Sequence, residues 1–405
     1  MITPEKQVEL LTRGCVEVIT DEELVDKIKR KGRLTVKYGA DPSAPDLHLG
    51  HSIPLRKLRQ FQELGHRVIF IIGDFTAMIG DPTGVSSTRR QLSREEVQAN
   101  AQTYLQQVGK ILDLEKTEVV FNSQWFSRMS LEELINSLAS KYTLARILER
   151  DDFATRFKNE KPIYIHELLY PLMQGYDSLM ISADVEIGGT DQKFNMLVGR
   201  ELQREVGQEP QIVMTLPLLE GLDGVAKMSK SLNNYVGLTE PPDVMFGKLM
   251  SISDELMWRY IELLTDTPPQ EIEALKRKVG EGRLNPMEVK MKLAFDIVAM
   301  YHNEQLAQQA KREFEKVFRQ RDIPSKLEEV VISKDYLKDG KLWVVKLLVL
   351  SGFVNGAREA KRLISQGAVR INKQQISNPD EDIVIEDGMV VQIGKRKFFR
   401  VVLGE

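Results

Sequence analysis

Short apolar runs alternate with longer amphipathic stretches over the first half of the chain. Four of the apolar runs have the length of a strand: residues 33–38, 67–72, 117–121 and 211–214. A run that is apolar at successive positions suits a strand buried on both faces, because neighbouring side chains of a strand point to opposite sides. The polar stretches between the runs are long enough to hold helices. This pattern predicts an α/β fold with a Rossmann-like parallel sheet covered by helices on both sides.

One of the intervening helices can be placed from its boundary residues. Pro54 suits a first helical turn, apolar side chains follow at helical spacing, and Gly65 is a stop signal. We therefore expect the helix to begin just after His51. The segment 48–51 would then lie at a strand-to-helix junction, where free backbone N–H groups and the helix dipole favour phosphate.

The pattern changes beyond the middle of the chain. Long amphipathic stretches from about residue 241 to 321 predict a separate helical domain. Turn-forming residues at 322–325 and 338–340 bracket an expected linker. The last part, residues 342–403, starts as helix and ends in short strands separated by turns.

Composition limits the class of protein. At 405 residues the chain is long enough for two or three domains. Its 42% hydrophobic and 28% charged residues are typical of a soluble globular protein. No stretch approaches the ~20 apolar residues that span a bilayer, and the first residues lack a signal-peptide pattern. The single Cys15 excludes an internal disulfide and a thiolate zinc cluster, so we expect a cytoplasmic protein.

Positive charge is concentrated near the C-terminus. Residues 341–375 hold seven basic side chains and one acidic one, whereas the whole chain has a net charge of −3. A basic module on an acidic chain indicates a polyanionic partner such as a nucleic acid. The alternative is a solvated helix face that happens to be basic.

Two short segments carry the strongest chemical signal. His48 and His51 lie three residues apart at the expected helix start, and Lys227 and Lys230 lie three apart in a loop that we expect to be mobile. Together they can surround one polyphosphate, with Gly50 leaving room for a nucleotide against the backbone. Such a set suits attack on the α-phosphate of ATP while charge builds on the departing pyrophosphate. Separately, the histidines could be a capping pair or a partial metal site, and the lysines a solvated loop.

A third group of residues has helical spacing. Tyr170, Gln174 and Asp177 stand at i, i+4 and i+7, so on a helix they share one face and can line one small pocket. A carboxylate at the end of an apolar slot accepts a hydrogen bond from a phenol and is left unpaired by a phenyl ring. Without the neighbouring motifs, an ordinary amphipathic helix would explain the same spacing.

These segments resemble a known family. Residues 38–51 and 227–231 are similar to the HIGH and KMSKS signatures of class I aminoacyl-tRNA synthetases, and residues 80–84, 170–177 and 188–192 narrow the resemblance to bacterial tyrosyl-tRNA synthetases. It extends over essentially the whole chain. It implies that tyrosine and ATP form tyrosyl-adenylate and pyrophosphate, and that the tyrosyl group passes to the 3′ end of tRNA(Tyr). It also implies a homodimer that meets through the catalytic domain, and magnesium that enters with ATP without a tightly bound cofactor or a dedicated metal site.

The resemblance assigns roles to individual residues. Catalysis of adenylate transfer falls to the signature side chains His48, His51, Lys227, Lys230 and Ser231. ATP and adenylate binding falls to Asp41, Gly50, Gly189, Asp191 and Gln192. Tyrosine binding falls to Asp81, Tyr170 and Gln174 at the ammonium group and to Asp177 at the phenol.

One position departs from the better-known form of the family. A second tyrosine that contacts the substrate phenol is replaced here by Lys37, which is similar to the second bacterial subtype. Lys37 is therefore a candidate tyrosine-binding residue that either makes an alternative polar contact or points away from the pocket.

The basic C-terminal segment resembles an RNA-binding module of the ribosomal S4 type. The side chains that would contact the phosphate backbone of tRNA are Arg358, Lys361, Arg362 and Arg370. The expected domains are a catalytic domain with a helical insertion (1–235), a helical domain that binds the anticodon arm (236–325), a linker (326–340) and the RNA-binding module (341–405).

Three alternatives remain at this stage. Another class I synthetase, such as a tryptophanyl enzyme, would share the fold and differ in the pocket. An inactive RNA-binding paralogue would bind tRNA without forming an adenylate. A small-molecule nucleotidyltransferase would explain the paired signatures but leave the basic C-terminal module unexplained.

Overall fold

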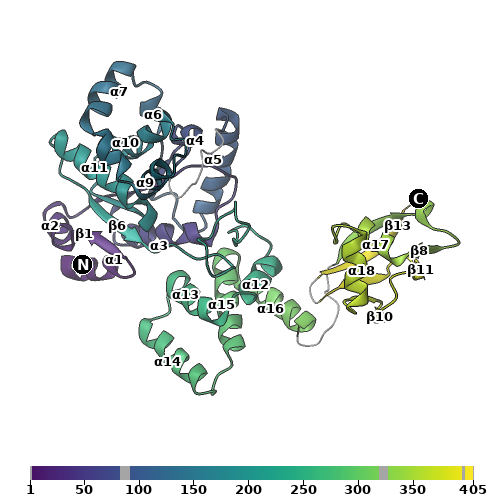
Figure 1. Ribbon diagram of the computed structural model, residues 1–405. Coiled ribbons are helices and arrows are strands. Elements are labelled where there is room, and N and C mark those ends of the chain that lie inside the picture. The colour runs from purple at the N-terminus through teal and green to yellow at the C-terminus, as the bar shows by residue number, and fades with distance from the viewer. Residues whose placement is uncertain (1, 83–91, 319–326, 395–396, 405) are drawn as a thin grey trace. The chain divides into compact units, whose positions relative to one another are not determined.

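The computed structural model describes residues 2–82, 92–318, 327–394 and 397–404. By its internal contacts the chain divides into two units, residues 1–304 and 305–405 (Figure 1). Thr83 and Gly84, part of one segment that carries the family resemblance, lie outside the described residues.

The first unit is built on a six-stranded sheet with the order β1-β6-β5-β2-β3-β4. The strands are β1 (Glu17–Ile19), β2 (Thr35–Ala40), β3 (Arg67–Ile72), β4 (Thr117–Phe121), β5 (Val185–Gly189) and β6 (Ile212–Leu216). Neighbours from β6 to β4 run parallel, and only the edge strand β1 is antiparallel. The predicted parallel sheet is confirmed, with β1 and β5 as strands that the apolar pattern did not reveal.

The helices from α1 to α11 connect and cover these strands. They are α1 (Pro4–Thr12), α2 (Asp21–Lys31), α3 (Leu49–Glu63), α4 (Thr76–Ile79), α5 (Arg94–Val108), α6 (Ser123–Phe126), α7 (Leu131–Ser137), α8 (Leu144–Leu148), α9 (Asp151–Lys158), α10 (Ile165–Met180) and α11 (Lys193–Glu205), with 3₁₀ turns η1 (Ala139–Lys141) and η2 (Thr190–Gln192). Every residue of β6 and all but one of β3 are buried. Because successive side chains of a strand face opposite ways, both faces of the sheet are covered.

Two glycines bring α10 and α11 together. A Cβ on Gly175 would lie 3.0 Å from the backbone nitrogen of Gly199, so the two helices can approach this closely only without side chains there. The two helices lie side by side (Figure 1), and α11 packs against β5 and β6. This packing fixes α10, and with it the face that carries Tyr170, Gln174 and Asp177, over the centre of the sheet.

The segment after the lysine-rich loop is helical, as the sequence predicts. It forms α12 (Pro242–Met250), α13 (Asp254–Leu264), α14 (Pro269–Gly280), α15 (Pro286–Tyr301) and α16 (Glu304–Phe318), and the division between the two units falls at the start of α16. The finer division into a catalytic, a helical and a C-terminal domain stays a prediction. None of the described helices is long and apolar enough to cross a bilayer.

The second unit ends in a small α+β module. Its strands are β7 (Glu328–Ser333), β8 (Lys341–Trp343), β9 (Val369–Ile371), β10 (Gln374–Ile376), β11 (Asp382–Val384), β12 (Val390–Ile393) and β13 (Lys397–Gly404), and its helices are η3 (Lys334–Tyr336), α17 (Val344–Leu350) and α18 (Ala357–Ser365). Five strands form a sheet in the order β10-β9-β12-β13-β7, and β11 pairs with β8.

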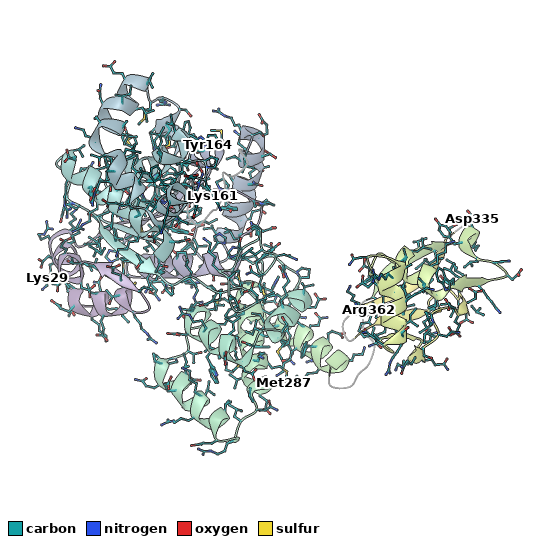
Figure 2. The ribbon with its side chains drawn as sticks, viewed as in Figure 1. Lys29, Lys161, Tyr164, Met287, Asp335 and Arg362 are labelled. Atoms are coloured by element: carbon teal, nitrogen blue, oxygen red, sulfur yellow. The ribbon has the colours of Figure 1, made fainter. Side chains whose placement is uncertain are left out.

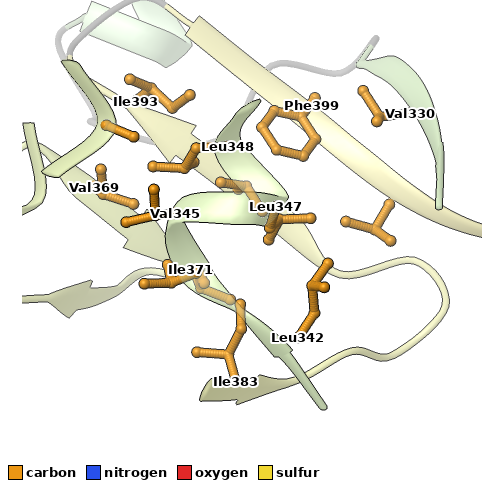
Figure 3. Close-up of a cluster of buried hydrophobic side chains, with 14 of the residues drawn as sticks. Val330, Leu342, Val345, Leu347, Leu348, Val369, Ile371, Ile383, Ile393 and Phe399 are labelled. Atoms are coloured by element: carbon orange, nitrogen blue, oxygen red, sulfur yellow. The ribbon is translucent and has the colours of Figure 1, made fainter. Parts of the chain in front are cut away.

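Apolar side chains of α17 and of the sheet form the core of this module. Leu347 and Leu348 pack among strand residues such as Val369 and Phe399 (Figure 3). The strand β7 belongs to this core as well, because Val330 and Ile332 point inward and the strand pairs in parallel with β13. Part of the segment predicted as a linker, residues 328–333, is therefore an edge strand of the module.

Candidate active site

The predicted nucleotide-binding residues lie where the strand order reverses. The sheet continues from β2 to β3 and β4 on one side, and from β2 to β5 and β6 on the other. Asp41 directly follows β2, Gly189 ends β5, and Asp191 and Gln192 form the turn after it. A switch point of this kind leaves a crevice beyond the carboxyl ends of the two central strands, which is where α/β proteins bind ligands.

Backbone hydrogen bonds join the first signature segment to the residues that follow the second. The backbone N–H of Leu49 donates to the carbonyl of Val236 at 2.9 Å, and that of Leu238 donates to Leu47 at 2.9 Å. His48 pairs with Gly237 in an antiparallel bridge. Residues 48–51 and the loop 227–231 are therefore close enough to share one nucleotide.

The helix that carries the histidines starts earlier than its sequence suggests. The helix α3 begins at Leu49, so His48 is the N-cap residue and His51 lies in the first turn, with Pro54 inside the helix. The expected start just after His51 was therefore wrong by three residues. Pro54 interrupts one bond of the ladder, because another residue at this position would donate its N–H to the carbonyl of Gly50.

The two histidine rings are in contact, with centroids 3.9 Å apart. The backbone N–H of His48 donates to Nδ1 of His51 at 3.2 Å, which places the proton of a neutral His51 ring on Nε2. Burial lowers the pKa of His51 to about 4 and that of His48 well below its usual value, and Lys230 adds to both shifts. At neutral pH both rings are therefore uncharged, and His51 offers an N–H donor.

Gly50 is required by the His48 ring. A Cβ at this position would lie 3.0 Å from both Nδ1 and Cε1 of His48 and 3.8 Å from Cβ of Met228. The packing of His48 thus gives a reason for the glycine besides the room for a nucleotide that the sequence suggested.

The lysines of the second segment differ in environment. Lys227 is exposed and forms an ion pair with Asp191, Nζ to Oδ2 3.0 Å. Burial lowers the pKa of Lys230 to about 8, against the opposing attraction of Asp46. A half-buried ammonium group such as Lys230 gains from a bound phosphate, because the phosphate replaces part of the interaction with water that burial removes.

The loop that carries these lysines is anchored by Asn234. The backbone N–H of Ser229 donates to Oδ1 of Asn234 at 2.8 Å, and Nδ2 of Asn234 donates to Asp223 at 2.7 Å. Asn234 is buried, so one end of the loop that we expected to be mobile is fixed to the protein. Ser231 is exposed and shares a hydrogen bond of 2.8 Å with the hydroxyl of Ser229.

Hydrogen bonds link the residues predicted to bind the ammonium group and the adenylate. The Tyr170 hydroxyl donates to Asp41 at 2.8 Å, and Nε2 of Gln192 donates to Asp81 at 2.8 Å. Nδ2 of Asn195 donates to Oε1 of Gln174 at 2.9 Å and to Oε1 of Gln192 at 3.0 Å. Acceptor oxygens from three different loops and from α10 thus gather in one place, as a cationic group requires.

Asp177 lies buried at the far end of this group. Trp125 donates its indole N–H to Oδ1 of Asp177 at 3.0 Å, and Asn122 donates to Oδ2 at 3.4 Å. Burial raises the pKa of Asp177 to about 7, although Lys37 and the two hydrogen bonds lower it. The result is an acceptor that is held in place by two donors and is costly to leave unpaired.

Lys37 is directed at protein groups and not at an open pocket. Its ammonium donates to the Gln174 carbonyl at 2.9 Å and to the Ser178 hydroxyl at 2.6 Å, and it pairs with Glu186 at 3.1 Å. A lysine has three N–H donors, so these partners account for all of them. Of the two alternatives for Lys37, the contacts favour the one without a direct bond to the phenol.

Several residues of the site were missed by the sequence reasoning. Arg150, from the insertion between β4 and α10, donates to Oδ1 of Asn195 at 3.0 Å and lies 3.7 Å from Asp81. Asn122 and Trp125 follow the carboxyl end of β4, and that position at the active edge of a parallel sheet is the signal that could have identified them.

The predicted RNA-binding residues lie on the C-terminal module. Arg358, Lys361 and Arg362 are exposed on α18, and Arg370 is the outward-facing residue of β9 (Figure 2 labels Arg362). Lys361 lies over the Trp343 ring and pairs with Asp380 at 3.1 Å. Arg358 and Arg362 are therefore the side chains of α18 that a polyanion would reach most directly.

No group of three or more His, Cys, Asp or Glu side chains suited to holding a metal ion occurs within residues 2–82, 92–318, 327–394 and 397–404.

Comparison with known proteins identifies the family. Residues 29–319 match the family model of class I tRNA synthetases (W and Y), and residues 342–387 match the S4 domain. The chain is 54% identical to a tyrosine–tRNA ligase of Thermotoga maritima, over 100% of this chain and 99% of the relative. It is 55% identical to a tyrosine–tRNA ligase of Aquifex aeolicus over the full length of both.

Solved structures agree in fold. The tyrosyl-tRNA synthetase of Archaeoglobus fulgidus, crystallised with L-tyrosine, matches with a TM-score of 0.62 at 23% identity over 76% of this chain and 99% of that one. A truncated mitochondrial tyrosyl-tRNA synthetase of Aspergillus nidulans matches with a TM-score of 0.65 at 21% identity over 78% and 95%. The chain therefore belongs to the class I tRNA synthetase family of tryptophan and tyrosine enzymes, and it carries an S4 domain.

Proposed function

We propose that this chain is a tyrosine–tRNA ligase, which activates L-tyrosine with ATP and transfers the tyrosyl group to tRNA(Tyr). The observations that carry the proposal are the meeting of residues 48–51 with the segment after residues 227–231, and the hydrogen-bonded group of Asp41, Tyr170, Gln174, Gln192 and Asn195 on the same sheet edge. The relatives that match over the whole chain bear the same name. Adenylate transfer needs a phosphate site beside an amino-acid site, because catalysis of this reaction consists mainly of positioning the reactants and stabilising the charge that develops.

In the proposed first step the tyrosine carboxylate attacks the α-phosphate, and pyrophosphate leaves. The Nε2–H of His51 donates to a phosphate oxygen, while Lys227 and Lys230 compensate the charge that moves onto pyrophosphate. Lys227 exchanges Asp191 for the nucleotide, whereas the charge of Lys230 already acts on both histidines. Magnesium arrives with ATP as part of that substrate, held mainly by phosphate oxygens and water.

In the proposed tyrosine site the ammonium group lies among Asp81, Tyr170 and Gln174, and the phenol donates to Asp177. Phenylalanine would fill the slot and leave the Asp177 carboxylate without its ligand donor. The free-energy cost of leaving this buried acceptor without the hydrogen bond of the phenol falls on phenylalanine alone, and it discriminates between the two amino acids.

Exchange of labelled pyrophosphate into ATP tests this function. The proposal expects exchange that depends on tyrosine and is absent with tryptophan or phenylalanine at the same concentration. Exchange that depends on tryptophan would identify the other specificity of the family. Absence of exchange with all amino acids, together with tRNA binding, would identify an inactive RNA-binding paralogue.

The proposed tRNA contact of the C-terminal module is electrostatic. A protein that neutralises phosphates releases counterions. Each lost phosphate contact therefore reduces the magnitude of the negative slope of log affinity against log salt by about 1. The double variant R358A/R362A should bind tRNA(Tyr) at least about tenfold more weakly at 0.1 M salt, with a slope smaller by about 2. Filter binding over a salt series measures both.

Pyrophosphate exchange in R358A/R362A should stay unchanged, because α18 belongs to the other structural unit. Lys6→Ala, which removes an exposed lysine of α1 paired with Glu9, is the matched control and should leave the slope unchanged. An unaltered slope in R358A/R362A would contradict the proposed RNA contact.

We also propose that the protein is a homodimer, which works in the cytoplasm. Support comes from exposed apolar side chains concentrated in the insertion and at the start of α10: Leu131, Ile135, Leu144, Phe157, Tyr164 and Ile165. Tyr164, labelled in Figure 2, is exposed in the turn that precedes α10. That turn is held by a buried ion pair of Arg156 with Glu167, 2.8 Å, so its apolar side chains are presented by a rigid support. Apolar surface of this kind marks association sites.

Ile165→Asp should therefore convert the dimer to monomers. Ile165 is 78% exposed, so the substitution removes little packing within the chain, but it would bury a charge in an apolar interface. Analytical ultracentrifugation at micromolar concentration measures the change. Val16→Asp, at an exposed apolar position before β1, is the control and should remain dimeric. A dimeric I165D variant would show that this surface is not the interface.

A further inference from the structure

A buried ion pair lies beneath the proposed tyrosine site. Lys37 of β2 and Glu186 of β5 are direct partners in the parallel register of the two central strands. Their side chains are 1% and 2% exposed, and Nζ lies 3.1 Å from Oε1. Charges are rarely placed at the centre of a sheet, because taking both out of water carries a large desolvation penalty before they attract each other.

Glu186 is satisfied by four donors from neighbouring elements. Besides Lys37, its Oε1 accepts from Nε2 of Gln174 at 3.0 Å. Its Oε2 accepts from the Ser178 hydroxyl at 3.2 Å and from Nε2 of Gln211 at 2.5 Å. The carboxylate is therefore fixed in position and has no open side for a ligand.

The bond to Glu186 decides which way the amide of Gln174 points. A carboxylate can only accept hydrogen bonds, so Gln174 must turn its NH₂ group toward Glu186 and its Oε1 the other way. Oε1 accepts one bond from Asn195 at 2.9 Å and keeps a second lone pair. That oxygen is the acceptor that an ammonium group needs.

Lys37 makes this orientation unique. With the Lys37 ammonium 3.1 Å away and three further donors around it, Glu186 only accepts hydrogen bonds. A buried carboxyl without a counter-charge tends to take up a proton, and would then be able to donate and to accept either end of an amide. Lys37 thus compensates the charge of Glu186 and also fixes the direction of the hydrogen bond between Gln174 and Glu186.

We propose that Lys37 and Glu186 form a positioning pair for tyrosine: Glu186 orients the Gln174 amide so that its oxygen receives the substrate ammonium, Lys37 keeps Glu186 in the accepting state, and neither touches the substrate. This inference rests on the proposed function and deepens it. It replaces the expectation that Lys37 is a binding residue by a role that acts through Gln174.

Steady-state kinetics of Glu186→Gln in the pyrophosphate-exchange assay tests the pair. The introduced amide can present its own NH₂ group to Gln174 and allow the Gln174 amide to turn. We expect the KM for tyrosine to rise about 10- to 100-fold, with kcat within about 3-fold and the KM for ATP within about 2-fold, because only uniform binding of the ammonium is lost.

An analogue without the ammonium group makes the test specific. The inhibition constant of 3-(4-hydroxyphenyl)propionate, which keeps the phenol and carboxylate of tyrosine, should be equal in wild type and E186Q. A general loosening of the pocket would weaken this inhibitor together with tyrosine, and that result would overturn the proposal.

Two further variants separate positioning from stability. Asp184→Asn removes the charge of another buried carboxylate, which pairs with Lys31 at 2.5 Å just before β5 and away from Gln174. It should lower thermal stability and leave the KM for tyrosine unchanged. The double variant K37M/E186Q removes both charges, so it should regain stability lost in the single variants while its KM for tyrosine stays at least about 10-fold raised.

The outcomes also separate this inference from the proposed function. A wild-type protein without tyrosine-dependent exchange would refute the function itself. An active wild type with a normal KM in E186Q, or a normal KM in K37M/E186Q, would refute the positioning pair and leave the function intact.

Discussion

Replacing Lys230 by alanine should slow adenylate formation by about 10²- to 10³-fold while changing tyrosine affinity by less than about 2-fold, since removing one preorganised stabiliser of developing charge has an effect of this size. The charge of Lys230 acts on His48 and His51, whose pKa values it lowers, and it is not among the groups that act on Asp177. Its charge is needed most when pyrophosphate departs, so the loss should fall on the chemical step. Stopped-flow fluorescence of adenylate formation, with tyrosine titrated separately, measures the two quantities.

Two controls accompany this variant. Lys230→Arg keeps the charge and should recover a large part of the rate. Lys248→Ala removes a lysine of α12 that pairs with Glu240 at 2.6 Å, and should leave the rate nearly unchanged. An unchanged rate in K230A together with weakened tyrosine affinity would show that Lys230 acts in tyrosine binding and not in the chemical step.

The lowered pKa of Lys230 adds a pH dependence with a definite sign. With a pKa of about 8, the side chain loses its proton in the free enzyme as the pH rises through 8. The value of kcat/KM for ATP should therefore fall above pH 8, since this parameter reports groups of the free enzyme. Bound triphosphate favours the ammonium form, so kcat should fall only at higher pH.

Replacing Asp177 by asparagine should reduce the preference for tyrosine over phenylalanine by about 10- to 100-fold in kcat/KM, because a hydrogen bond to a charged group contributes about 1.5–3 kcal/mol and its loss removes the penalty against phenylalanine. Asp177 is buried, and hydrogen bonds from Trp125 and Asn122 fix the positions of both of its oxygens. Pyrophosphate exchange with each amino acid gives the ratio. An unchanged ratio would place the phenol elsewhere.

The same substitution should change how stability depends on pH. Burial raises the pKa of Asp177 from 3.8 to about 7. Between these values the folded state holds more protons than the unfolded state, so the contribution of Asp177 to stability falls as the pH rises and is lowest above pH 7. The full difference is on the order of 4 kcal/mol at 1.36 kcal/mol per pKa unit. Thermal unfolding at pH 5 and pH 8 should show a decline in wild type that is smaller in D177N.

The sequence predicted those parts of the structure that depend on local pattern. The apolar runs at 67–72 and 117–121 are strands with the expected bounds, since an apolar run bounded by polar residues has few other solutions. The helical spacing of Tyr170, Gln174 and Asp177 placed them correctly on α10. The match of residues 29–319 to the family model then confirms the family that the signature segments indicated.

The strand β5 was missed because its most important residue contradicts the apolar pattern. Glu186 interrupts a run of apolar side chains and is tolerated only through Lys37 from β2, Gln174 from α10 and Gln211 next to β6. These partners lie outside the strand in the sequence, so local pattern has no information about them. The sequence does contain one signal for this strand. Lys37 and Glu186 are opposite charges that each stand inside an apolar segment, and this pattern is typical of a buried ion pair between two strands.

The start of α3 and the strand β7 were missed for a different reason. Pro54 is a strong local signal for a first turn, but contacts of residues 47–49 with residues 236–238 hold the helix start three residues earlier than expected. The strand β7 has only two inward apolar residues, Val330 and Ile332, and it forms by pairing with β13 at the far end of the module's sequence. In both cases long-range pairing overrides local preference.

A crystal structure of the protein with a non-hydrolysable tyrosyl-adenylate analogue tests the central claim most directly. Our account predicts the phenol oxygen within hydrogen-bonding distance of the Asp177 carboxylate, the amino group beside Oε1 of Gln174, and the phosphate mimic between His51 and Lys230. A complex in which the aromatic ring lies away from Asp177, or in which the phosphate mimic contacts neither residues 48–51 nor residues 227–231, would contradict it.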